Sequence, residues 1–371
     1  MSEFFIGLMS GTSMDGIDAA LVNFDNDIVQ LVHHHSHPLP SKLRDNLLKL
    51  SLDTPDISLD ILGETDAELG NVFADAVIEL LDKSKVNANE IKAIGSHGQT
   101  IRHKPEAEFP FSLQIGDANH ITNKTGITTV ADFRRKDMAA GGQGAPLAPT
   151  FHNAFFRSEK ENRAVLNIGG IANITFLPKD TNKICFGFDT GPGNMLMDSW
   201  VSQNKQQPYD KDGEWAGSIQ ANNDLVNKLM NDNFIHQQPP KSTGREHYNI
   251  AWLNTLLKNC PPLSIDVIQA SLCDFTAQSI TYAIEHYLPN ISTLIVCGGG
   301  VHNKHLMRQL GTSLNKINIA SSDQYNLPAD WVEAVAFAWL AKQTLEGKAG
   351  NLPEVTGAKQ ATVLGAIYPA K

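Results

Sequence analysis

The chain has 371 residues, of which 42% are hydrophobic and 19% are charged, and its formal net charge is −10 at pH 7. This composition is typical of a soluble globular protein, and the length exceeds what one hydrophobic core usually fills, so we expect two domains. With 40 acidic against 30 basic residues, the chain has no overall positive field to attract nucleic acid or an anionic membrane. We expect neither as a partner.

Cysteine usage and the start of the chain bear on the compartment. The cysteines Cys185, Cys260, Cys273 and Cys297 are far apart and form no CxxC pair, which favours free thiols over a disulfide framework. The first residues lead directly into a strand, without a basic and then apolar leader, and no apolar run has the length of a membrane span. The sequence therefore predicts a cytoplasmic protein.

Residues 4–24, FFIGLMSGTSMDGIDAALVNF, predict two apolar strands joined by a turn of small and hydroxylated residues. Gly11 and Gly16 permit close approach of the backbone, so the amides of Gly11, Thr12 and Ser13 are candidates for binding an anion. An ordinary hairpin is the alternative.

Residues 27–37 predict a further strand that ends in HHHSH, and residues 39–52 and 59–83 predict helices. The histidines His33, His34, His35 and His37 are a possible metal site. Because neighbours along a strand point to opposite faces, a solvated strand end is the favoured interpretation.

Two later segments combine strand ends with polar loops. Residues 91–103, IKAIGSHGQTIRH, predict a short strand that breaks into a polar loop, and ligand sites of α/β proteins lie at such strand ends. Residues 128–150 predict a strand, a basic patch and a Gly/Pro-rich segment. This segment is the best candidate for a domain boundary, and its adjacent arginines favour a ligand-binding role over a plain linker.

The second half of the chain repeats the order of predicted elements found in the first half. Residues 163–177, RAVLNIGGIANITFL, again predict strand, glycine turn and strand, and they are followed by GFDTGPGN at 187–194. Residues 263–288 predict a long helix, and residues 292–310 predict a buried strand, a triple glycine and a helix. The repetition suggests two related α/β domains.

Three glycine motifs in this order resemble the two phosphate loops and the adenosine loop of the sugar kinase, Hsp70 and actin superfamily. Within it, the strings SGTSMDGID, ADFRRKDMAAGGQGAPL, NIGGIANIT, FDTGPGN, STGREHYN and CGGGVHN resemble the anhydro-N-acetylmuramic acid kinase family, over nearly the whole chain. Sugar kinases commonly have an aspartate two residues before the first glycine, where this chain has Met9, so metal placement by analogy is open.

The resemblance implies two actin-like (ribonuclease H-like) α/β domains, with mixed sheets flanked by helices and a central cleft. We place the first domain at residues 1–130 and the second at 131–371, and the return of the C-terminal segment to the first domain is left open. Family members convert 1,6-anhydro-N-acetylmuramic acid, ATP and water to N-acetylmuramic acid 6-phosphate and ADP, in the recycling of peptidoglycan. Magnesium is implied by ATP.

Asp189 is the candidate catalytic base, because it ends a strand directly before the turn TGPGN. O6 of the implied substrate is locked in an internal acetal with C1, so a carboxylate that deprotonates water would couple attack on C1 to phosphoryl capture of O6. The usual second carboxylate of a glycosidase is then unnecessary. A turn or helix N-cap aspartate is the structural alternative.

The implied sugar carries a carboxylate, which predicts a cationic partner. Arg134 or Arg135 suits bidentate binding, and surface exposure is the rival explanation for one of the pair. Glu333, an isolated acid at the start of an apolar helix, either interacts with the helix N-terminus or binds sugar hydroxyls or water. The other predicted sugar-site residues are His97, Gln99 and Thr100, and Arg245 and Glu246 either close the pocket or fold locally.

The nucleotide is expected to contact all three glycine motifs, and close helix packing is the alternative for the triple glycine. The predicted ATP-binding residues are Gly11, Thr12, Ser13, Met14, Asp15, Gly16, Ile17, Asp18, Thr190, Gly191, Gly193, Gly298, Gly299, Gly300 and Asn303. Asp15, Asp18 and Asp189 are unranked candidates for a magnesium ligand.

Two other functions are weighed against this one. The first is a kinase for another hexose or carboxylate, which would phosphorylate a free hydroxyl. The second is a nucleotide-gated binding protein, which is disfavoured because no peptide-binding domain follows the last predicted helix. The oligomeric state is open, with a homodimer as one option.

Overall fold

The computed structural model describes residues 3–11, 14–25, 28–52 and 58–370, and in it the chain divides into two compact units. Unit 1 comprises Met1–Phe155 and Trp331–Lys371, and unit 2 comprises Phe156–Asp330. The boundary expected at residues 130 and 131 thus falls inside unit 1, and the C-terminal segment groups with the N-terminal residues.

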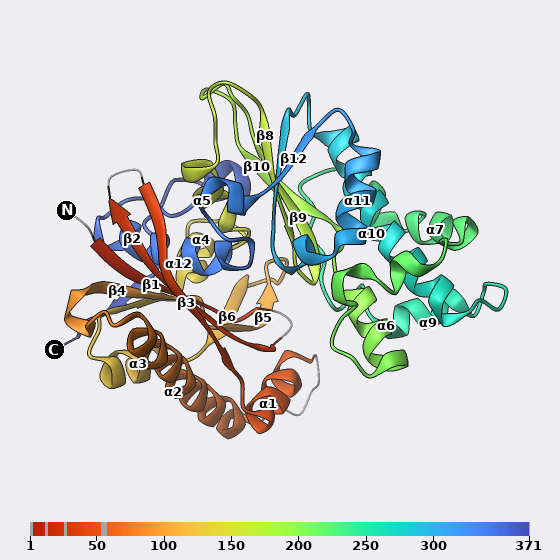
Figure 1. The fold of residues 1–371 in the computed structure, drawn as a ribbon. Helices are drawn as coiled ribbons and strands as arrows, with labels where there is room; N and C mark the ends of the chain where they lie inside the picture. Colours follow the sequence, from red (N-terminus) through yellow and green to blue (C-terminus); the bar gives the residue numbers. More distant parts are fainter. Residues whose placement is uncertain (1–2, 12–13, 26–27, 53–57, 371) are drawn as a thin grey trace. The chain divides into compact units, whose positions relative to one another are not determined.

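Unit 1 contains, within its described residues, a six-stranded sheet in the order β13-β7-β4-β1-β2-β3 and a two-stranded sheet of β5 and β6 (Figure 1). Strands β1, β2 and β3 form an antiparallel meander, whereas β4 pairs parallel with both β1 and β7. The strands are β1 Glu3–Met9, β2 Gly16–Asp25, β3 Ile28–Pro38, β4 Ile91–Ser96, β5 Gln99–Lys104, β6 Phe111–Ile115, β7 Thr129–Ala131 and β13 Ala366–Tyr368. The helices are α1 Ser41–Ser51, α2 Leu59–Ser84, α3 Ala118–Thr125, α4 Phe133–Ala139, α5 Ala148–Phe155, α12 Val332–Leu345 and α13 Pro353–Thr356.

Unit 2, whose residues are all described, contains a five-stranded sheet in the order β10-β9-β8-β11-β12. Strands β8, β9 and β10 again form an antiparallel meander, and β11 pairs parallel with β8 and β12. The strands are β8 Arg163–Ile168, β9 Ile171–Leu177, β10 Phe186–Pro192, β11 Thr293–Cys297 and β12 Asn318–Ser321. The helices are α6 Met195–Lys205, α7 Asn223–Met230, α8 Asn233–His236, α9 Ile250–Leu257, α10 Ile265–Tyr287 and α11 Lys304–Ser313.

The larger sheet of unit 1 and the sheet of unit 2 share one topology. In each, the first strand of an antiparallel meander is followed in the sheet, on its other side, by two parallel strands. This duplication confirms the predicted pair of related α/β domains with mixed sheets and flanking helices. It also confirms the predicted strand-turn-strand motifs, which form β1-β2 in unit 1 and β8-β9 in unit 2.

Alternating residues of β1 face two different layers of unit 1. Ile6 and Leu8 belong to the core cluster that includes Leu47 of α1 and Phe73 of α2. Gly7 faces α12, since a Cβ there would lie 1.7 Å from the carbonyl oxygen of Ala334. The absence of a side chain therefore allows α12 to lie directly on the sheet.

The Gly/Pro-rich segment at 128–150 is integrated into unit 1. The buried carboxylate of Asp137 accepts hydrogen bonds from the Gly144 amide (2.8 Å), Asn351 Nδ2 (2.7 Å) and Thr356 Oγ1 (2.8 Å). These bonds join the segment to the C-terminal residues of the same unit. This explains why the strongest loop signal in the sequence does not coincide with the division between the units.

The structure corrects one local prediction. Gln99 and Thr100, predicted as part of a polar loop, begin strand β5, which pairs antiparallel with β6. The alternating burial of Gln99, Thr100, Ile101 and Arg102 fits a strand better than a loop. The four cysteines are free thiols. No helix in the described part of the chain combines the length and apolarity needed to cross a bilayer.

Candidate active site

Asp189 lies in β10 of unit 2, at an irregularity of the sheet. It pairs with Asn173 of β9, whereas the next paired residue is Gly191, so Thr190 is left as the extra residue of a bulge. Bulges bend a strand and re-aim its side chains, and they occur often beside active sites. The structure therefore places the predicted base at a point where the strand departs from regular pairing.

Three neighbouring residues hold Asp189. Its Oδ2 accepts hydrogen bonds from Ser242 Oγ (2.8 Å) and the Thr243 amide (2.9 Å), and its own amide donates to the Lys241 carbonyl (3.1 Å). Burial raises the pKa of Asp189 to about 6, aided by the charge of Glu246 and opposed by the two hydrogen bonds and by Lys241. A carboxylate with such a pKa is ionised at neutral pH and basic enough to accept a proton from water.

Lys241 is a buried cation near this carboxylate. Its Nζ donates to the carbonyls of Phe234 (2.9 Å) and Ile235 (2.8 Å) and lies 4.7 Å from the centroid of the Phe234 ring. Burial lowers the pKa of Lys241 to about 8, and the charge of Asp189 opposes this shift. The side chain is fixed by carbonyls and aromatic rings, so its charge acts on Asp189 from a set position.

A second group of residues fixes Thr243. His247 Nδ1 lies 3.4 Å from Thr243 Oγ1, and its Nε2 lies 3.1 Å from Asp232 Oδ2. Asp232 Oδ1 in turn accepts from Tyr248 Oη (3.1 Å) and from the Phe234 amide (3.0 Å). The chain Asp232–His247–Thr243 thus leads to the amide that holds the carboxylate of Asp189.

Several of the residues that support Asp189, but not Asp189 itself, border a pocket within unit 2 with a volume of about 410 Å³. Its lining residues are Asp232, Asn233, Phe234, Gln237, Ser242, Thr243, Glu246 and His247. Glu246, which was predicted either to close a pocket or to fold locally, is one of these lining residues.

The second predicted phosphate loop is largely occupied by internal hydrogen bonds. Thr190 is fully buried, and its hydroxyl donates to the Ala172 carbonyl (3.2 Å). Gly191 pairs with Ala172 and has φ +150°. The Gly193 amide donates to the Gly170 carbonyl (2.9 Å). In this conformation the Gly193 amide is therefore engaged, and its binding to phosphate remains a proposal that requires this bond to open.

The first predicted phosphate hairpin is only partly described. Thr12 and Ser13 lie outside the described residues. The Met14 amide donates to the Gly11 carbonyl (3.2 Å), and the side chains of Met14 and Ile17 belong to the core. Any contact of these two residues with a nucleotide must therefore use their backbone.

The other hairpin residues have separate environments. Asp15 is exposed and lies 3.4 Å from Arg44 Nη2. Gly16 lies so close to β3 that a Cβ there would be 2.8 Å from the His37 carbonyl oxygen. Asp18 is partly buried and pairs with Met9 across the β1-β2 ladder.

The predicted sugar-site residues His97 and Arg134 are in direct contact. Arg134 Nε and Nη2 lie 3.1 and 2.9 Å from His97 Nε2, and Arg134 Nη1 donates to the Gly144 carbonyl (2.8 Å). His97 Nδ1 lies 2.9 Å from the Gly98 carbonyl, so the ring is consistent with a neutral tautomer that donates from Nδ1 and accepts from Arg134. Burial lowers the pKa of His97 well below its usual value, with Arg134 adding to the shift.

Glu333 interacts electrostatically with Arg134. It lies in the first turn of α12, and burial raises its pKa, with Arg134 opposing and Asp18 reinforcing the shift. Burial lowers the pKa of Arg134 to about 10, with Glu333 and Asp137 opposing. Arg135, by contrast, is exposed and lies 2.7 Å from Asp132, so it is the surface member of the arginine pair.

The side chains of Gln99 and Thr100 take part in different hydrogen-bond networks. Gln99 is buried, with Oε1 2.7 Å from Ser10 Oγ, which in turn lies 3.2 Å from the Gly16 carbonyl. Thr100 Oγ1 accepts from Gln114 Nε2 (3.0 Å). Gln99 therefore supports the β1-β2 hairpin, while Thr100 belongs to the β5-β6 sheet.

Two glycines of the triple glycine are closely packed, and the third is exposed. A Cβ on Gly298 would lie 2.3 Å from Asn167 Oδ1, and one on Gly300 would lie 2.3 Å from Ile168 Cγ2, so packing against β8 accounts for both glycines. Gly299 is exposed, and its Cβ would meet nothing nearer than Asn194 Nδ2 at 4.0 Å. Asn303 caps α11, since its Oδ1 accepts from the Leu306 amide (3.0 Å).

The residues that support Asp189 were not predicted as such from the sequence. Lys241, Ser242 and Thr243 lie far from Asp189 in sequence, and Lys241 and Asp232 lie outside every motif that the sequence offered. The string STGREHYN was a usable signal, because it placed hydroxyls and a histidine in one short segment. It gave no indication of the strand beside which that segment folds.

Comparison with known proteins identifies the family. The model of the family described as anhydro-N-acetylmuramic acid kinase matches residues 3–370. The chain belongs to the anhydro-N-acetylmuramic acid kinase family.

Curated relatives agree with this family membership. An anhydro-N-acetylmuramic acid kinase of Coxiella burnetii (strain RSA 493 / Nine Mile phase I) is 51% identical over 366 residues, which cover 99% of this chain and 97% of the relative. The corresponding kinase of Aliivibrio fischeri (strain ATCC 700601 / ES114) is 47% identical over 369 residues, covering 99% of this chain and all of the relative. That of Vibrio vulnificus (strain YJ016) is 48% identical, with coverages of 99% and 98%.

Solved structures give weaker likenesses. Component A of the (R)-2-hydroxyglutaryl-CoA dehydratase of Acidaminococcus fermentans has a TM-score of 0.46 at 10% identity, covering 91% of this chain and 96% of that one. A ROK family glucokinase of Streptomyces griseus has a TM-score of 0.41 at 11% identity, covering 92% and 99%. Likenesses at this level carry no argument about function, and the family assignment rests on the sequence relatives.

Proposed function

We propose that this chain uses ATP and water to open the internal acetal of 1,6-anhydro-N-acetylmuramic acid and to phosphorylate O6. The products are N-acetylmuramic acid 6-phosphate and ADP, and the reaction serves peptidoglycan recycling in the cytoplasm. Membership of the kinase family supports the substrate and the use of ATP. The observation that supports the mechanism is Asp189, a partly buried carboxylate with a pKa of about 6 at a strand bulge.

Asp189 accepts a proton from water as the water oxygen bonds to C1. The bond between C1 and O6 breaks, O6 takes the γ-phosphoryl group of ATP, and ADP leaves. The hydrogen bonds from Ser242 and the Thr243 amide go to one carboxylate oxygen, Oδ2. They orient the carboxylate so that Oδ1 is the proposed proton acceptor. Lys241, Thr243, His247 and Asp232 act as positioning residues in this proposal.

Arg134 and Glu333 are the proposed sugar-binding groups. The guanidinium of Arg134 is fixed by His97 and by the Gly144 carbonyl, which orients it for the carboxylate of the substrate's lactyl group. Glu333 would accept hydrogen bonds from sugar hydroxyls or orient the water. Gln99 and Thr100 are retained as weaker proposals, with Gln99 acting through the hairpin.

For the nucleotide, we propose that the backbone of residues 11–18 and that of residues 190–193 contact phosphates, and that adenosine approaches Gly299. Bound magnesium would be held chiefly by phosphate oxygens and water, as is usual for this ion. The charge it supplies would neutralise the phosphates. Asp18 and Asp189 offer partly buried carboxylates for an outer contact, and Asp15 offers an exposed one.

The direct test supplies purified protein with ATP, magnesium and 1,6-anhydro-N-acetylmuramic acid, and determines the product mass. We expect a product that gains one phosphoryl group and one water. A matched incubation supplies hexoses that carry a free 6-hydroxyl. Turnover of such a hexose, without turnover of the anhydro sugar, would establish the alternative hexose kinase. ATP binding without phosphorylation of any sugar would instead favour a nucleotide-gated binding protein.

A further inference from the structure

The histidine-rich end of β3 has a structured face. Along β3, His33, His35 and His37 are half-buried, whereas Val32, His34 and Ser36 are exposed. His35 pairs with Ala19 and His37 with Ile17 across the antiparallel ladder, and both partners are buried in the core. Since paired residues share a face, His35 and His37 point to the side of the sheet that packs against α2.

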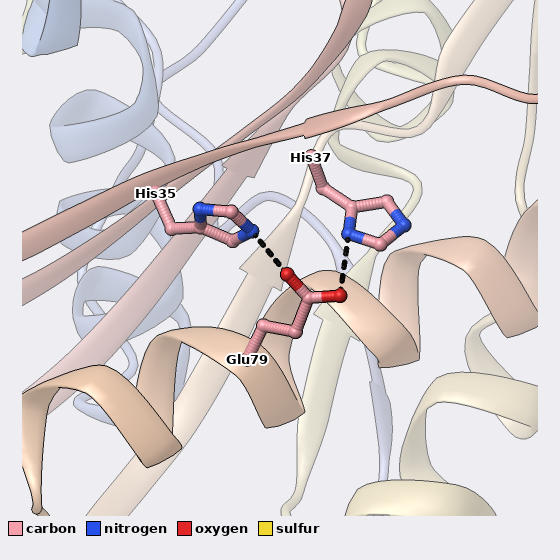
Figure 2. A group of neighbouring side chains, drawn as sticks. All are labelled: His35, His37 and Glu79. Atoms are coloured by element: carbon pink, nitrogen blue, oxygen red, sulfur yellow. Dashed lines mark ion pairs between the residues drawn. The ribbon is translucent and has the colours of Figure 1, made fainter.

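Glu79 of α2 faces these two histidines. Figure 2 shows both imidazole rings directed at its carboxylate, with His35 Nε2 2.8 Å from Oε2 and His37 Nδ1 3.3 Å from Oε1. Nδ1 of His37 is buried and has no hydrogen-bond partner of acceptable geometry in the described residues. The carboxylate therefore leaves one of the two ring nitrogens poorly satisfied.

The spacing of the three side chains suits a metal ion. One ligand atom from each of them lies within 4.8 Å of the others. Zinc binds imidazole nitrogen and carboxylate oxygen at about 2.0–2.2 Å, so ligand atoms of a tetrahedral site lie roughly 3.3 Å apart. The separations from His35 Nε2 to Oε2 and from His37 Nδ1 to Oε1 of Glu79, 2.8 and 3.3 Å, are close to this spacing, so side-chain adjustment can place an ion between the three groups.

We propose that His35, His37 and Glu79 form a zinc site that links the edge strand β3 to helix α2, with water in the fourth position. Two imidazoles and one carboxylate favour zinc over magnesium or calcium, because those ions prefer all-oxygen ligands. The site lies on β3, the edge strand of its sheet. Its role is to hold this strand against the helix.

Lys83 gives the proposal a specific test. Its Nζ lies 2.9 Å from His35 Nδ1 and 3.8 Å from Glu79 Oε2, and its side chain is 49% exposed. A positive charge at this distance competes with a metal ion for the same groups. When zinc binds Nε2 of His35, Nδ1 carries the proton, so the ammonium of Lys83 must turn away into solvent.

The experiment uses the full chain without a histidine tag, freed of metal with a chelator. Zinc is titrated in competition with a chromophoric chelator, and we expect one equivalent to bind. His35→Ala, His37→Ala and Glu79→Gln each weaken binding by about tenfold or more, since losing even an outer partner of a metal ligand costs that much. Lys83→Gln tightens binding severalfold. His34→Ala, which removes a histidine of the opposite face, leaves zinc affinity unchanged.

Thermal unfolding supplies a second readout. Zinc raises the Tm of the unaltered chain because a ligand of the folded state stabilises it, and it raises the Tm of Glu79→Gln much less. Glu79→Gln keeps the size of the side chain, so this comparison decides the matter even if a histidine variant does not fold. Absence of stoichiometric zinc binding, or equal zinc affinity in the unaltered chain and Glu79→Gln, would overturn the proposal.

Discussion

Asp189 is held by groups that shift its pKa in opposite directions. Burial and Glu246 raise the pKa, whereas Ser242 and the Thr243 amide lower it. Together these effects bring the pKa of the carboxyl close to neutral pH, where a general base is most effective. Each contributing side chain can therefore be tested through the pH dependence of turnover.

The first prediction concerns Asp189 itself. Asp189→Asn removes the proton acceptor, and turnover falls by about 10²–10⁴-fold, the usual contribution of a general base. The amide oxygen can replace Oδ2 as the acceptor for Ser242 and Thr243, so the fold and ATP affinity are retained. Steady-state kinetics and nucleotide binding measure the two effects. Asp224→Asn, an exposed change in the same unit, serves as the control. Near-normal turnover of Asp189→Asn would remove Asp189 from the base role.

The second prediction concerns the acid limb of the pH profile. Asp189 must be ionised to act, so kcat/KM falls as the pH drops below about 6, the pKa that burial produces. Ser242→Ala removes a hydrogen bond that lowers the pKa, so the limb moves to higher pH. Glu246→Gln removes a charge that raises it, so the limb moves to lower pH. Equal midpoints for the two variants would contradict this assignment.

Residue identities were predictable where a motif carried them. The prediction of Asp189 rested on FDTGPGN, that of Arg134 on ADFRRKDMAAGGQGAPL, and that of His97 on the strand end at residues 91–103, and their functional roles stay predictions. The interpretation of HHHSH as a solvated strand end overlooked that residues 33, 35 and 37 share one face. Glu79 lies on a separate helix, and no pattern in the sequence joined it to the histidines.

At the scale of elements, the two helices that follow β3 and the long helix of unit 2 were predicted nearly to their ends. The prediction at 39–52 corresponds to α1, the one at 59–83 to α2, and the one at 263–288 to α10. The strand β5 was missed because its pairing partner, β6, comes later in the chain and has a weak apolar pattern of its own. Short paired strands depend on such tertiary partners.

The third prediction separates the glycines of the triple-glycine turn. Gly300→Ala lowers the free energy of unfolding by about 1–3 kcal/mol, since its Cβ would overlap Ile168. Gly299→Ala leaves stability nearly unchanged and raises the KM for ATP severalfold, because the new methyl group stands where we propose that adenosine approaches. Chemical denaturation and kinetics distinguish the two. Gly311→Ala, with no atom within 4 Å of the new Cβ, is the control. An unaltered KM in Gly299→Ala would exclude this position from the nucleotide site.

At the scale of the whole molecule, unit 2 is one continuous segment, whereas unit 1 is assembled from two separated segments. The expected boundary at residues 130 and 131 followed a glycine-rich loop, and the buried carboxylate of Asp137 shows why that loop is no linker. Such a long-range bond leaves no mark in local composition. The repeated topology, by contrast, was visible in sequence as two similar strand-turn-strand motifs.

The fourth prediction follows from this assembly. Residues 156–330 expressed alone fold cooperatively, because their core cluster lies entirely within the segment. Residues 1–155 alone do not, because they lack α12 and the residues that bind Asp137. Circular dichroism and thermal melting of each segment measure this. A cooperative transition of residues 1–155 would show that α12 is dispensable for that sheet.

The central claim is that opening of the acetal and phosphorylation are one coupled reaction. Turnover in ¹⁸O-labelled water, stopped early and examined by mass spectrometry of product fragments, locates the oxygen that water supplies. The account predicts the label on C1, unlabelled phosphate on O6, and no opening of the sugar without ATP. A label in the phosphate group, or a product that is phosphorylated but still bicyclic, would contradict it.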